Sequence, residues 1–570
     1  MDYIRVRKAN CKNCYRCLKN CYVKSIKFKD EKVSVISDKC VLCGECIISC
    51  PQKAKHAQSD ILKVMEFIKN PNIKTVVSLA PSFSSAFGKN SEKIVSLLKA
   101  FGFDEVEETA IGAAYVTKRY KELIEEGKMD NIITSCCPTV NMYIKKYYPE
   151  LTKYIAPVMS PAIAHGKLIK KKYGNDVKVI FAGPCLSKIK EIDDNPKYAD
   201  GTITFEQVMK WIKNEKISLD ELDKAEFSAV SSFSRIYPIE SGVIEDIKSI
   251  SSLCREEGEG KYNFLSVSGL KDISRLLDDI QSGKIVNVFA EVNACRGGCV
   301  NGPLMPEGKE YSFADNINIK KYAISADTKN NYEQEDISAE YKPEHFDDAM
   351  PTDEEIQKIL FQIGKYSKEQ ELNCGSCGYP TCRDKAIAVY QKKAELYMCL
   401  PYMSDMNQAM ANVTLSVTPN YIIAVDEDMS IKEFNVAAQK LFKVSRNDVI
   451  GKSLYEFIDT ADFEEVIKNK KSIYAKKVKY DSLGISTSQD IIYVKERNLA
   501  IAIIYDITEE EQQKESVRML KLESVDMAQK VIDKQMTVAQ QIASLLGETT
   551  AETKVTLNKL KNLIASEETD

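Results

Sequence analysis

Histidine is scarce in this chain of 570 residues, which has only His56, His165 and His345. Because imidazole is a common metal ligand and the usual acid–base group near neutral pH, this scarcity nearly excludes histidine-based chemistry as the main activity. No apolar run reaches the ~18 residues that a membrane-spanning helix needs, and the start has no charged-then-apolar leader. A net charge of −4 gives no sign of a nucleic-acid partner. We therefore expect a cytoplasmic protein without a membrane or nucleic-acid partner.

Cysteine, by contrast, is abundant, with 18 residues. In an oxidising compartment so many thiols would pair as disulfides, so their number predicts a reducing cytosol. Thiolates select iron–sulfur clusters, zinc and copper(I). The rest of the composition, 44% hydrophobic and 28% charged, is ordinary for globular chains. At ~150 residues per domain, the length predicts about four domains.

Five cysteines lie in three loops, each of which follows a short apolar run that is typical of a buried strand. The loops are residues 134–138, 183–191 and 291–299, and the preceding runs are residues 131–133, 177–181 and 285–290. Ligands of open α/β sheets bind beyond the carboxyl ends of strands, so distant thiols could converge on one site. Apart from the adjacent Cys136 and Cys137, only Cys295 and Cys299 are close in sequence, unlike the local pairs of a zinc finger. Buried structural thiols are the alternative, which suits the isolated Cys254 better than these ordered loops.

These three loops resemble the signature motifs of the iron-only (FeFe) hydrogenases, and the resemblance extends over residues 1–310. It implies a two-lobed α/β domain over residues 70–365 that oxidises molecular hydrogen to protons and electrons at an oxygen-sensitive H-cluster, as in an anaerobe. That group is a 4Fe–4S cubane joined to a di-iron subcluster carrying CO, cyanide and an aza-dithiolate. The implied cubane ligands are Cys137, Cys185, Cys295 and Cys299, the last of which also bridges to the di-iron unit.

The same resemblance implies catalytic roles for four further side chains, Cys136, Lys188, Glu191 and Ser160. Cys136 would pass protons to and from the di-iron unit, and Lys188 would hydrogen-bond a cyanide. Glu191 and Ser160 would continue the proton path. The ordinary thiol pKa of ~8.5 is close enough to neutral for efficient proton transfer.

Several residues depart from the pattern of the catalytic family members. Gly183 and Asn293 stand where those members usually carry methionines packed on the di-iron unit. The helix expected after Thr109 has no carboxylate before Glu122, although catalytic members have acidic relay residues there. A repacked pocket and a broken proton path predict slow turnover and altered redox tuning. In these departures the chain resembles the sensory branch of the family.

Residues 1–58 contain two cysteine runs with the spacing of bacterial ferredoxins, in which the fourth cysteine of each run ligates the other cluster. One predicted 4Fe–4S cluster uses Cys11, Cys14, Cys17 and Cys50. The other uses Cys40, Cys43, Cys46 and Cys21. A zinc site or a disulfide framework is the alternative, and the doubled spacing disfavours both. Two cubanes beside a redox-active site would form an electron relay.

A third cysteine set lies within residues 366–402. Its members are Cys374, Cys377, Cys382 and Cys399. The spacing resembles a small 4Fe–4S module of corrinoid iron–sulfur proteins and of sensory hydrogenases, and a zinc knuckle is the alternative. We therefore expect three 4Fe–4S clusters in addition to the H-cluster, which leaves only Cys254 without a role.

Neither cysteine nor histidine occurs after Cys399, so a histidine-ligated haem and a cysteinyl-flavin are excluded from the C-terminal region. Residues 409–508 end in Asp506-Ile507-Thr508 and resemble a PAS domain, which implies a five-stranded antiparallel sheet with small helices. Asp506 or Thr508 can cap the helix that follows. We expect a cofactor-free relay domain, with a non-covalent flavin or small ligand as the alternative.

Residues 509–570 have a helical pattern. One heptad register places apolar residues at core positions, with polar Gln529 at one of them: Leu522, Val525, Ile532, Met536, Ala539, Ala543 and Leu546. Such a seam favours a coiled coil and a homodimer, whereas a single amphipathic helix packed on its own PAS domain is the alternative. We see no kinase or phosphatase domain, so any signalling partner of that kind is expected to be a separate protein.

Three functions compete on this sequence. The favoured one is a hydrogen-responsive redox sensor with weak hydrogenase activity, because the departures and the signalling tail occur together. The second is a working ferredoxin-linked hydrogenase with a regulatory tail, supported by the intact Cys136, Lys188 and Glu191. The third is a non-catalytic iron–sulfur scaffold or assembly protein, which the Cys136-Cys137 pair and the full ferredoxin set count against. Ferredoxin or another redox protein would be the electron partner.

Overall fold

The computed structural model describes residues 2–231, 233–250, 261–324, 332–346, 348–481, 483–546 and 551–566. Two compact units divide the chain, Met1–Tyr402 and Met403–Asp570. Cys254 lies outside the described residues, so its lack of a role stays a prediction. Among the helices of the described part, none combines the length and the apolar character that crossing a membrane requires.

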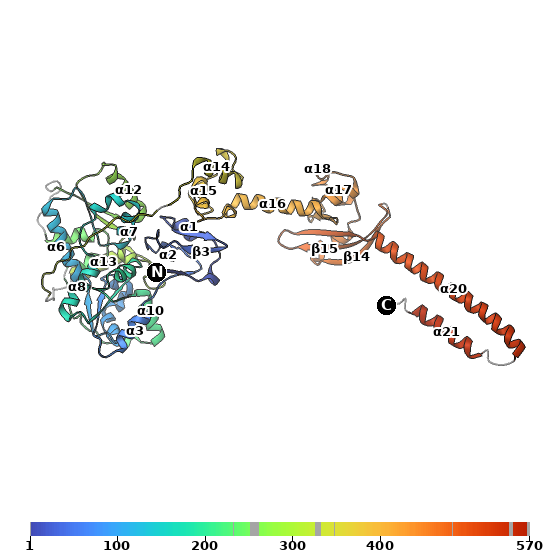
Figure 1. The fold of residues 1–570 in the computed structure, drawn as a ribbon, viewed down its shortest axis with the longest axis horizontal. Helices are drawn as coiled ribbons and strands as arrows, with labels where there is room; N and C mark the ends of the chain where they lie inside the picture. The colour runs from blue at the N-terminus through green and yellow to red at the C-terminus, as the bar shows by residue number, and fades with distance from the viewer. Residues whose placement is uncertain are drawn as a thin grey trace. The chain divides into compact units, whose positions relative to one another are not determined.

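Two parallel β-sheets lie at the centre of the first unit (Figure 1). One has the strand order β6-β5-β8-β9, with bounds Glu105–Glu108, Thr75–Leu79, Lys178–Gly183 and Gly201–Thr204. The other has the order β10-β11-β7, with bounds Asn263–Ser268, Val288–Asn293 and Ile132–Ile133. The central strands β5 and β11 are buried along their whole length, as parallel strands covered on both faces are.

The two sheets are joined by long helices. Helix α6 (Ala110–Glu126) leads from β6 in the first sheet to β7 in the second, and α8 (Pro161–Tyr173) leads back to β8. The two helices pack closely at Gly112, where a Cβ atom would lie 2.2 Å from the carbonyl oxygen of Pro161. Any larger residue at this position would push the helices apart.

The three predicted strands are present as β7, β8 and β11. The third begins at Val288 rather than at residue 285. Asn287, directly before it, has a φ of 55°, a left-handed conformation that does not fit a strand. The ends of β8 and β11 are Gly183 and Asn293, so the cysteine-bearing loops start where the strands stop.

The N-terminal segment consists of two small antiparallel pairs and two short helices. Strand β1 (Ile4–Val6) pairs with β4 (Lys55–Ala57), and β2 (Ile26–Lys29) pairs with β3 (Lys32–Val35). The helices are α1 (Arg16–Asn20) and α2 (Glu45–Ile48), and each holds the third cysteine of its run. Helix α3 (Ile61–Lys69) then leads to β5.

The first unit ends in a small helical segment around the third cysteine set. Helix α14 (Asp353–Gln362) and helix α15 (Cys382–Tyr390) both start with capping boxes, at Thr352 and Thr381. These reciprocal hydrogen bonds satisfy backbone donors that a helix start leaves unpaired. Helix α16 (Leu400–Val417) begins directly after Cys399.

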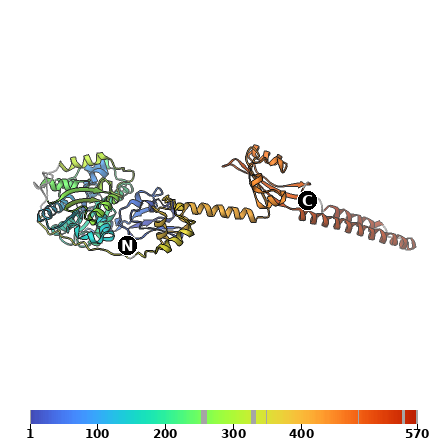
Figure 2. The same ribbon diagram turned by 90° about the horizontal axis from the view of Figure 1, so that it is seen from above.

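The second unit contains the five-stranded antiparallel sheet predicted for a PAS domain (Figure 2). The strand order is β13-β12-β16-β15-β14, with bounds Ile431–Phe434, Tyr421–Val425, Leu499–Asp506, Ile485–Val494 and Ile473–Tyr480. Three helices cover it, α17 (Val436–Phe442), α18 (Arg446–Val449) and α19 (Ala461–Asn469). Phe434, Phe463 and Ile491 are buried between them.

Two helices follow the PAS sheet. The backbone N–H of Thr508 donates to the Asp506 carboxylate over 2.9 Å, so Asp506 caps helix α20 (Thr508–Leu546) as expected. Helix α21 (Ala551–Ser566) runs back beside α20 and contacts it. Four residues of the predicted seam are half-buried, namely Val525, Gln529, Ile532 and Met536. A coiled coil with a second chain stays a prediction.

Candidate functional site

One cavity receives all five cysteines of the three predicted loops. It contains about 970 Å³ of space free of protein atoms. Its wall includes Cys136, Cys137, Cys185, Cys295 and Cys299. Because β7 and β11 belong to one sheet and β8 to the other, the thiols come from the carboxyl ends of both sheets. The loops after β5 and β6 complete the wall with Ala80, Pro81, Ser82 and Thr109.

The third loop reaches the cavity through glycines that allow close backbone contacts. Gly298 has a φ of 98°, and a Cβ atom there would lie 2.4 Å from the carbonyl oxygen of Pro238. A Cβ atom at Gly302 would lie 2.7 Å from the carbonyl oxygen of Pro184, in the second loop. Larger residues at either position would move Cys299 away from the other thiols.

The wall of the cavity is mostly apolar, which affects its thiols. Burial raises the pKa of Cys137 and, more strongly, of Cys295 and Cys299, and charge on the neighbouring thiols raises these values further. The cysteines are therefore protonated when no metal is bound, and metal binding would release their protons. Four converging soft thiols are a donor set that fits an iron–sulfur cubane.

Lys188, Ser160 and Glu191 form a hydrogen-bonded cluster at one side of the cavity. The Lys188 ammonium donates to Ser160 Oγ over 2.8 Å and to Glu191 Oε2 over 2.6 Å. Ser160 in turn donates to Glu191 over 2.9 Å. Helix α9 (Ser187–Asp194) places Lys188 and Glu191 three residues apart on one face. Lys188 lines the cavity, whereas Ser160 and Glu191 line a separate cleft on the outer side.

Burial lowers the pKa of Lys188, but the Glu191 carboxylate and nearby thiolates outweigh burial and raise it above its ordinary value. Lys188 is therefore a fixed positive charge in the cavity wall at neutral pH. An ammonium donor in an apolar wall is suited to bind an anionic ligand.

Cys136 has a different environment from the other four thiols. Its sulfur lies 3.2 Å from the hydroxyl of Tyr120, which is also 3.0 Å from Ser135 Oγ. The backbone N–H of Ser135 donates to the same hydroxyl over 2.8 Å. Asn141 donates to the Ser135 carbonyl over 2.8 Å and so fixes the loop. No pattern in the sequence pointed to Tyr120, which lies on α6, 16 residues before the cysteine.

The residues that depart from the pattern of the catalytic family members have identifiable surroundings in the structure. A Cβ atom at Gly183 would lie 2.8 Å from the Phe181 ring, and Phe181 itself lines the cavity. Asn293 lines the cavity too and donates to Glu291 over 3.2 Å. Glu122 is outside the cavity, where it pairs with Arg119 over 2.9 Å. Of the described residues that line the cavity, none is acidic.

The N-terminal cysteines lie close to one another, while their division into two ligand sets stays a prediction. Burial raises the pKa of Cys40, Cys43 and Cys46, and charge on Cys21 raises all three further, so Cys21 lies near the second run. Lys55 interacts with Cys17, Cys46 and Cys50, which belong to both runs. Cys43 also lines the cavity of the three loops.

The third cysteine set shares one small pocket, lined by Cys374, Cys377, Cys382 and Cys399. In the part of the chain that the structure describes, no three or more His, Cys, Asp or Glu side chains are placed to hold a single metal ion. This segment packs directly on the ferredoxin-like segment.

Three contacts join those two segments. The Lys24 ammonium donates to the carbonyl oxygen of Gly378 over 2.9 Å. A Cβ atom at Gly378 would lie 2.3 Å from the Leu18 side chain, so only glycine allows this approach. The Phe28 N–H donates to the carbonyl oxygen of Lys393 over 2.9 Å. The third cysteine set therefore lies beside the Cys21 end of the ferredoxin-like segment.

Fold and cysteine sets together define a multi-domain iron–sulfur protein. Residues 73–303 match the family model described as "Iron only hydrogenase large subunit, C-terminal domain". Residues 33–56 match a 4Fe-4S binding domain, residues 370–401 an Fe-S cluster family, and residues 406–481 the PAS fold.

Curated relatives include both hydrogenases and assembly factors. Iron hydrogenase 1 of Clostridium pasteurianum is 27% identical over 52% of this chain and 68% of its own length. The NADP-reducing hydrogenase subunit HndD of Solidesulfovibrio fructosivorans is 24% identical over 50% of this chain and 58% of its own. The cytosolic Fe-S cluster assembly factor narfl of Danio rerio is 22% identical over 54% of this chain and 84% of its own. The chain is an iron-only-hydrogenase-like protein with iron–sulfur domains and a PAS domain.

Proposed function

We propose that this protein binds molecular hydrogen at an H-cluster in the cysteine-lined cavity and acts as a hydrogen-responsive redox sensor with slow turnover. The observation that carries the proposal is the convergence of five thiols and the Lys188 ammonium on one cavity. The proposed cubane ligands are Cys137, Cys185, Cys295 and Cys299. When bound, the H-cluster would supply the chemistry that splits or forms hydrogen.

The chain's own groups support that chemistry in distinct ways. Lys188 presents a permanent positive charge to anionic ligands, since Glu191 keeps it protonated. Cys136 is the proposed acid–base thiol. It lines the cavity wall, and the other four cysteines already supply the four proposed cubane ligands. Apolar residues such as Phe181 and Pro184 exclude bulk water from the site.

Slow turnover follows from the surroundings of Cys136. Its sulfur contacts the Tyr120 hydroxyl, and none of the described wall residues is acidic. A phenol with an ordinary pKa of ~10 releases a proton far less readily than a carboxylic acid near neutral pH. Proton exit from Cys136 would therefore limit the rate.

A sensing role is supported by the position of the third cysteine set. It packs on the ferredoxin-like segment, which reaches the cavity through Cys43. Cys399 is directly followed by α16, which leads in sequence to the PAS domain. Three proposed 4Fe–4S clusters would carry electrons away from the cavity to ferredoxin or another redox partner, and their redox state would bias α16.

Output beyond the PAS domain is proposed to need a dimer and a separate kinase or phosphatase in the cytoplasm. The half-buried seam of α20 supports a helical output element. Removing all residues from Glu511 onward should yield a monomer if the tail dimerises the chain, as judged by light scattering. A truncated chain that remains dimeric would show that the PAS domain dimerises instead.

Two other functions remain in competition. A catalytic ferredoxin hydrogenase would show fast steady hydrogen oxidation with an electron-accepting dye. A scaffold or assembly role is favoured by the relatives named as Fe-S cluster assembly factors, and in that case no di-iron subcluster would be present.

The deciding experiment is an infrared spectrum of anaerobically purified, fully matured protein under argon and then under hydrogen. CO and cyanide bands that shift with hydrogen are expected, together with a low rate in the dye assay. Absence of those bands after competent maturation would favour the scaffold role. Shifting bands with a high rate would favour the catalytic hydrogenase.

A further inference from the structure

Two consecutive glutamates at the end of β6, Glu107 and Glu108, are completely buried. Glu108 is held by Arg235, whose Nε and Nη2 atoms each donate over 2.7 Å. This bidentate pair neutralises the carboxylate locally. Glu107 has a different set of partners, which the hydrogenase-like chemistry described above does not use.

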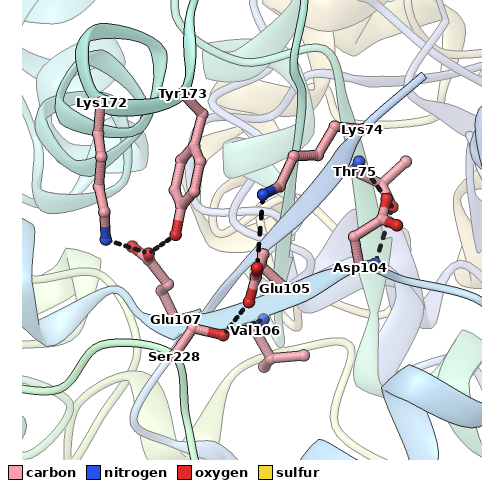
Figure 3. Close-up of polar contacts among 9 residues, drawn as sticks. All are labelled: Lys74, Thr75, Asp104, Glu105, Val106, Glu107, Lys172, Tyr173 and Ser228. Atoms are coloured by element: carbon pink, nitrogen blue, oxygen red, sulfur yellow. Dashed lines mark hydrogen bonds and ion pairs between the residues drawn. The ribbon is translucent and has the colours of Figure 1, made fainter. Parts of the chain in front are cut away.

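Glu107 receives hydrogen bonds from several elements. Figure 3 shows Lys172 and Tyr173, both on α8, pointing toward its carboxylate. Lys172 Nζ donates over 3.1 Å and the Tyr173 hydroxyl over 2.8 Å. The Tyr332 hydroxyl also donates to it. Glu105, on the same strand, instead contacts Lys74 and Ser228.

The remaining partner of Glu107 is the imidazole of His165. His165 Nε2 lies 3.2 Å from Glu107 Oε2, and Nδ1 lies 2.8 Å from Ser78 Oγ. Ser78 Oγ lies 2.8 Å from Thr109 Oγ1. Thr109 lines the thiol cavity. An unbroken series of four polar side chains thus connects the cavity wall with Glu107.

The outer end of this series approaches solvent. His165 and Glu107 have no exposed side-chain surface, whereas the Lys172 side chain is 30% exposed. Tyr173 and Tyr332 are half-buried. The ring of Tyr332 lies 4.7 Å from the Lys172 ammonium, so these three side chains form the cover over Glu107.

Ionised Glu107 fixes the direction of the hydrogen bonds. Burial raises the pKa of Glu107, but the hydrogen bond and the electrostatic interaction with His165, together with hydrogen bonds from Tyr332 and Tyr173, outweigh burial and lower it to about 2. The carboxylate is therefore an acceptor, and His165 carries a proton on Nε2. In the tautomer that the relay uses, Nδ1 is the acceptor. Nδ1 then accepts from Ser78, and Ser78 accepts from Thr109. This leaves lone pairs of the Thr109 oxygen for a donor in the cavity.

We propose that Thr109, Ser78, His165 and Glu107 form a proton relay between the thiol cavity and the protein surface. The inference rests on the proposed function, because it needs an acid that gives up protons in the cavity. It is separate from the Lys188–Ser160–Glu191 cluster, which presents a positive charge to the cavity. Its inner end consists of neutral hydroxyls instead of a fixed ammonium.

One proton crosses the relay in a series of coupled transfers. Thr109 Oγ1 gains a proton from the cavity acid and gives its own to Ser78, which gives its own to His165 Nδ1. The imidazolium then releases the Nε2 proton to Glu107. Glu107 gives a proton to the hydroxyl oxygen of Tyr173 or Tyr332, which releases its own proton to solvent. No electron moves, and each O–H or N–H bond broken is matched by one formed. Rotation of the hydroxyls and return of the imidazole to the Nε2–H tautomer reset the series.

The low pKa of Glu107 does not block this transfer. A carboxylate with a pKa of about 2 binds a proton only transiently at neutral pH. A transient protonated state is sufficient for a relay, because the group has to hold the proton only between two transfers.

A nucleophilic role for Ser78 does not suit the geometry. Ser78 is on strand β5 and is almost completely buried. It does not line the cavity, whereas its hydrogen-bond partner Thr109 does. A substrate could not reach the serine oxygen. Protons, which move by bond exchange, need no such access.

The first test does not require hydrogen chemistry. Full-length protein with its 4Fe–4S clusters but without the di-iron unit is labelled with ¹⁵N-histidine, and H165Q identifies the His165 signals among three histidines. We expect the Nε2–H tautomer and exchange of this N–H with D₂O within minutes. E107Q should slow the exchange at least tenfold. Exchange that occurs only on global unfolding, and is equal in E107Q, would overturn the relay.

The second test uses fully matured protein and measures isotope exchange between hydrogen and D₂O, which needs proton exit but no electron acceptor. S78A and H165Q should slow the exchange at least tenfold, with unchanged infrared bands, and S78T should restore it. T202V is the matched control, because Thr202 Oγ1 is buried in the same sheet without a hydrogen-bond partner among the described residues.

The outcomes separate the two proposals. Wild-type exchange rates in S78A and H165Q, with slow exchange in E191Q, would refute the relay and assign proton exit to Glu191. If matured wild-type protein shows no isotope exchange and no hydrogen-dependent bands, the proposed function fails. The histidine exchange measurement then decides the relay by itself.

Discussion

Two series of hydrogen-bonded polar side chains start at the same cavity. They differ in the charge of the side chain that lies nearest the cavity. The Lys188–Ser160–Glu191 cluster starts with an ammonium that its carboxylate partner keeps charged. The series from Thr109 to Glu107 starts with a hydroxyl and keeps its charge at the outer end. A fixed cation repels protons but holds an anion, whereas neutral hydroxyls pass protons. The comparison indicates that anchoring and proton exit can be divided between two series.

The largest effect is expected for Cys136→Ala, since Cys136 is the proposed acid from which proton exit starts, whichever series carries the proton onward. Hydrogen oxidation should fall at least about a hundredfold, the usual scale of a lost acid–base group. Iron content and infrared bands should persist, because the four proposed cubane ligands are intact. Turnover equal to wild type would remove Cys136 from the proton path.

Glu191→Gln tests the anchoring series. It leaves the buried Lys188 ammonium with Ser160 as its remaining partner in the cluster, and unpairing a buried charge costs about 3 kcal/mol. Urea unfolding should show this loss of stability, while isotope exchange stays within about threefold of wild type. Lys188→Met, an apolar replacement of similar length, is the control for packing. A large loss of exchange without a loss of stability would reverse the two assignments.

The dependence of folding stability on acidic pH tests whether Glu107, at the outer end of the relay, is ionised. The pKa of Glu107 is depressed from 4.5 to about 2 in the folded protein. Its contribution to stability is therefore present above pH ~4.5 and lost as the pH falls toward 2, and amounts to about 3 kcal/mol. The difference in unfolding free energy between wild type and E107Q should shrink as the pH falls from 6 to 3. A difference independent of pH would mean that Glu107 is not ionised in the fold.

The smallest effect is expected for Thr202→Val. The substitution keeps the shape and removes a buried hydroxyl without a hydrogen-bond partner among the described residues. Stability should be unchanged or rise by less than about 1 kcal/mol, and isotope exchange should equal wild type. A slowed exchange in T202V would show that the sheet as a whole, and not the relay, controls proton exit.

The cysteine-bearing loops could be predicted because their signals are local. An apolar run followed by a cysteine loop marks a strand end, and strand ends of parallel sheets meet at one edge. The start of β11 was misjudged by three residues, since the left-handed Asn287 leaves no mark in the apolar pattern. The packing of the third cysteine set on the ferredoxin-like segment was also missed. It depends on Gly378 meeting Leu18, a contact between distant parts of the chain.

The prediction that histidine chemistry is not the main activity of this protein leaves room for the role that we propose for His165. The scarcity of histidine argued against histidine-based chemistry as the main activity, and no pattern in the sequence distinguished His165. In the structure both of its ring nitrogens have buried polar partners. A count of residues cannot show which single residue lies between two other polar groups.

The sequence by itself determined the kind of metal chemistry, because thiol softness and the spacing of cysteines within a loop belong to short stretches of chain. It also determined the PAS sheet and its helical exit, whose alternating pattern and Asp506 cap are local. The tertiary structure alone decided which polar groups meet. Ser78 is 31 residues from Thr109 and 87 from His165, and hydrogen bonds between a strand and a helix from another crossover leave no spacing to detect. That is why the thiol cavity could be predicted and the series of polar groups behind it could not.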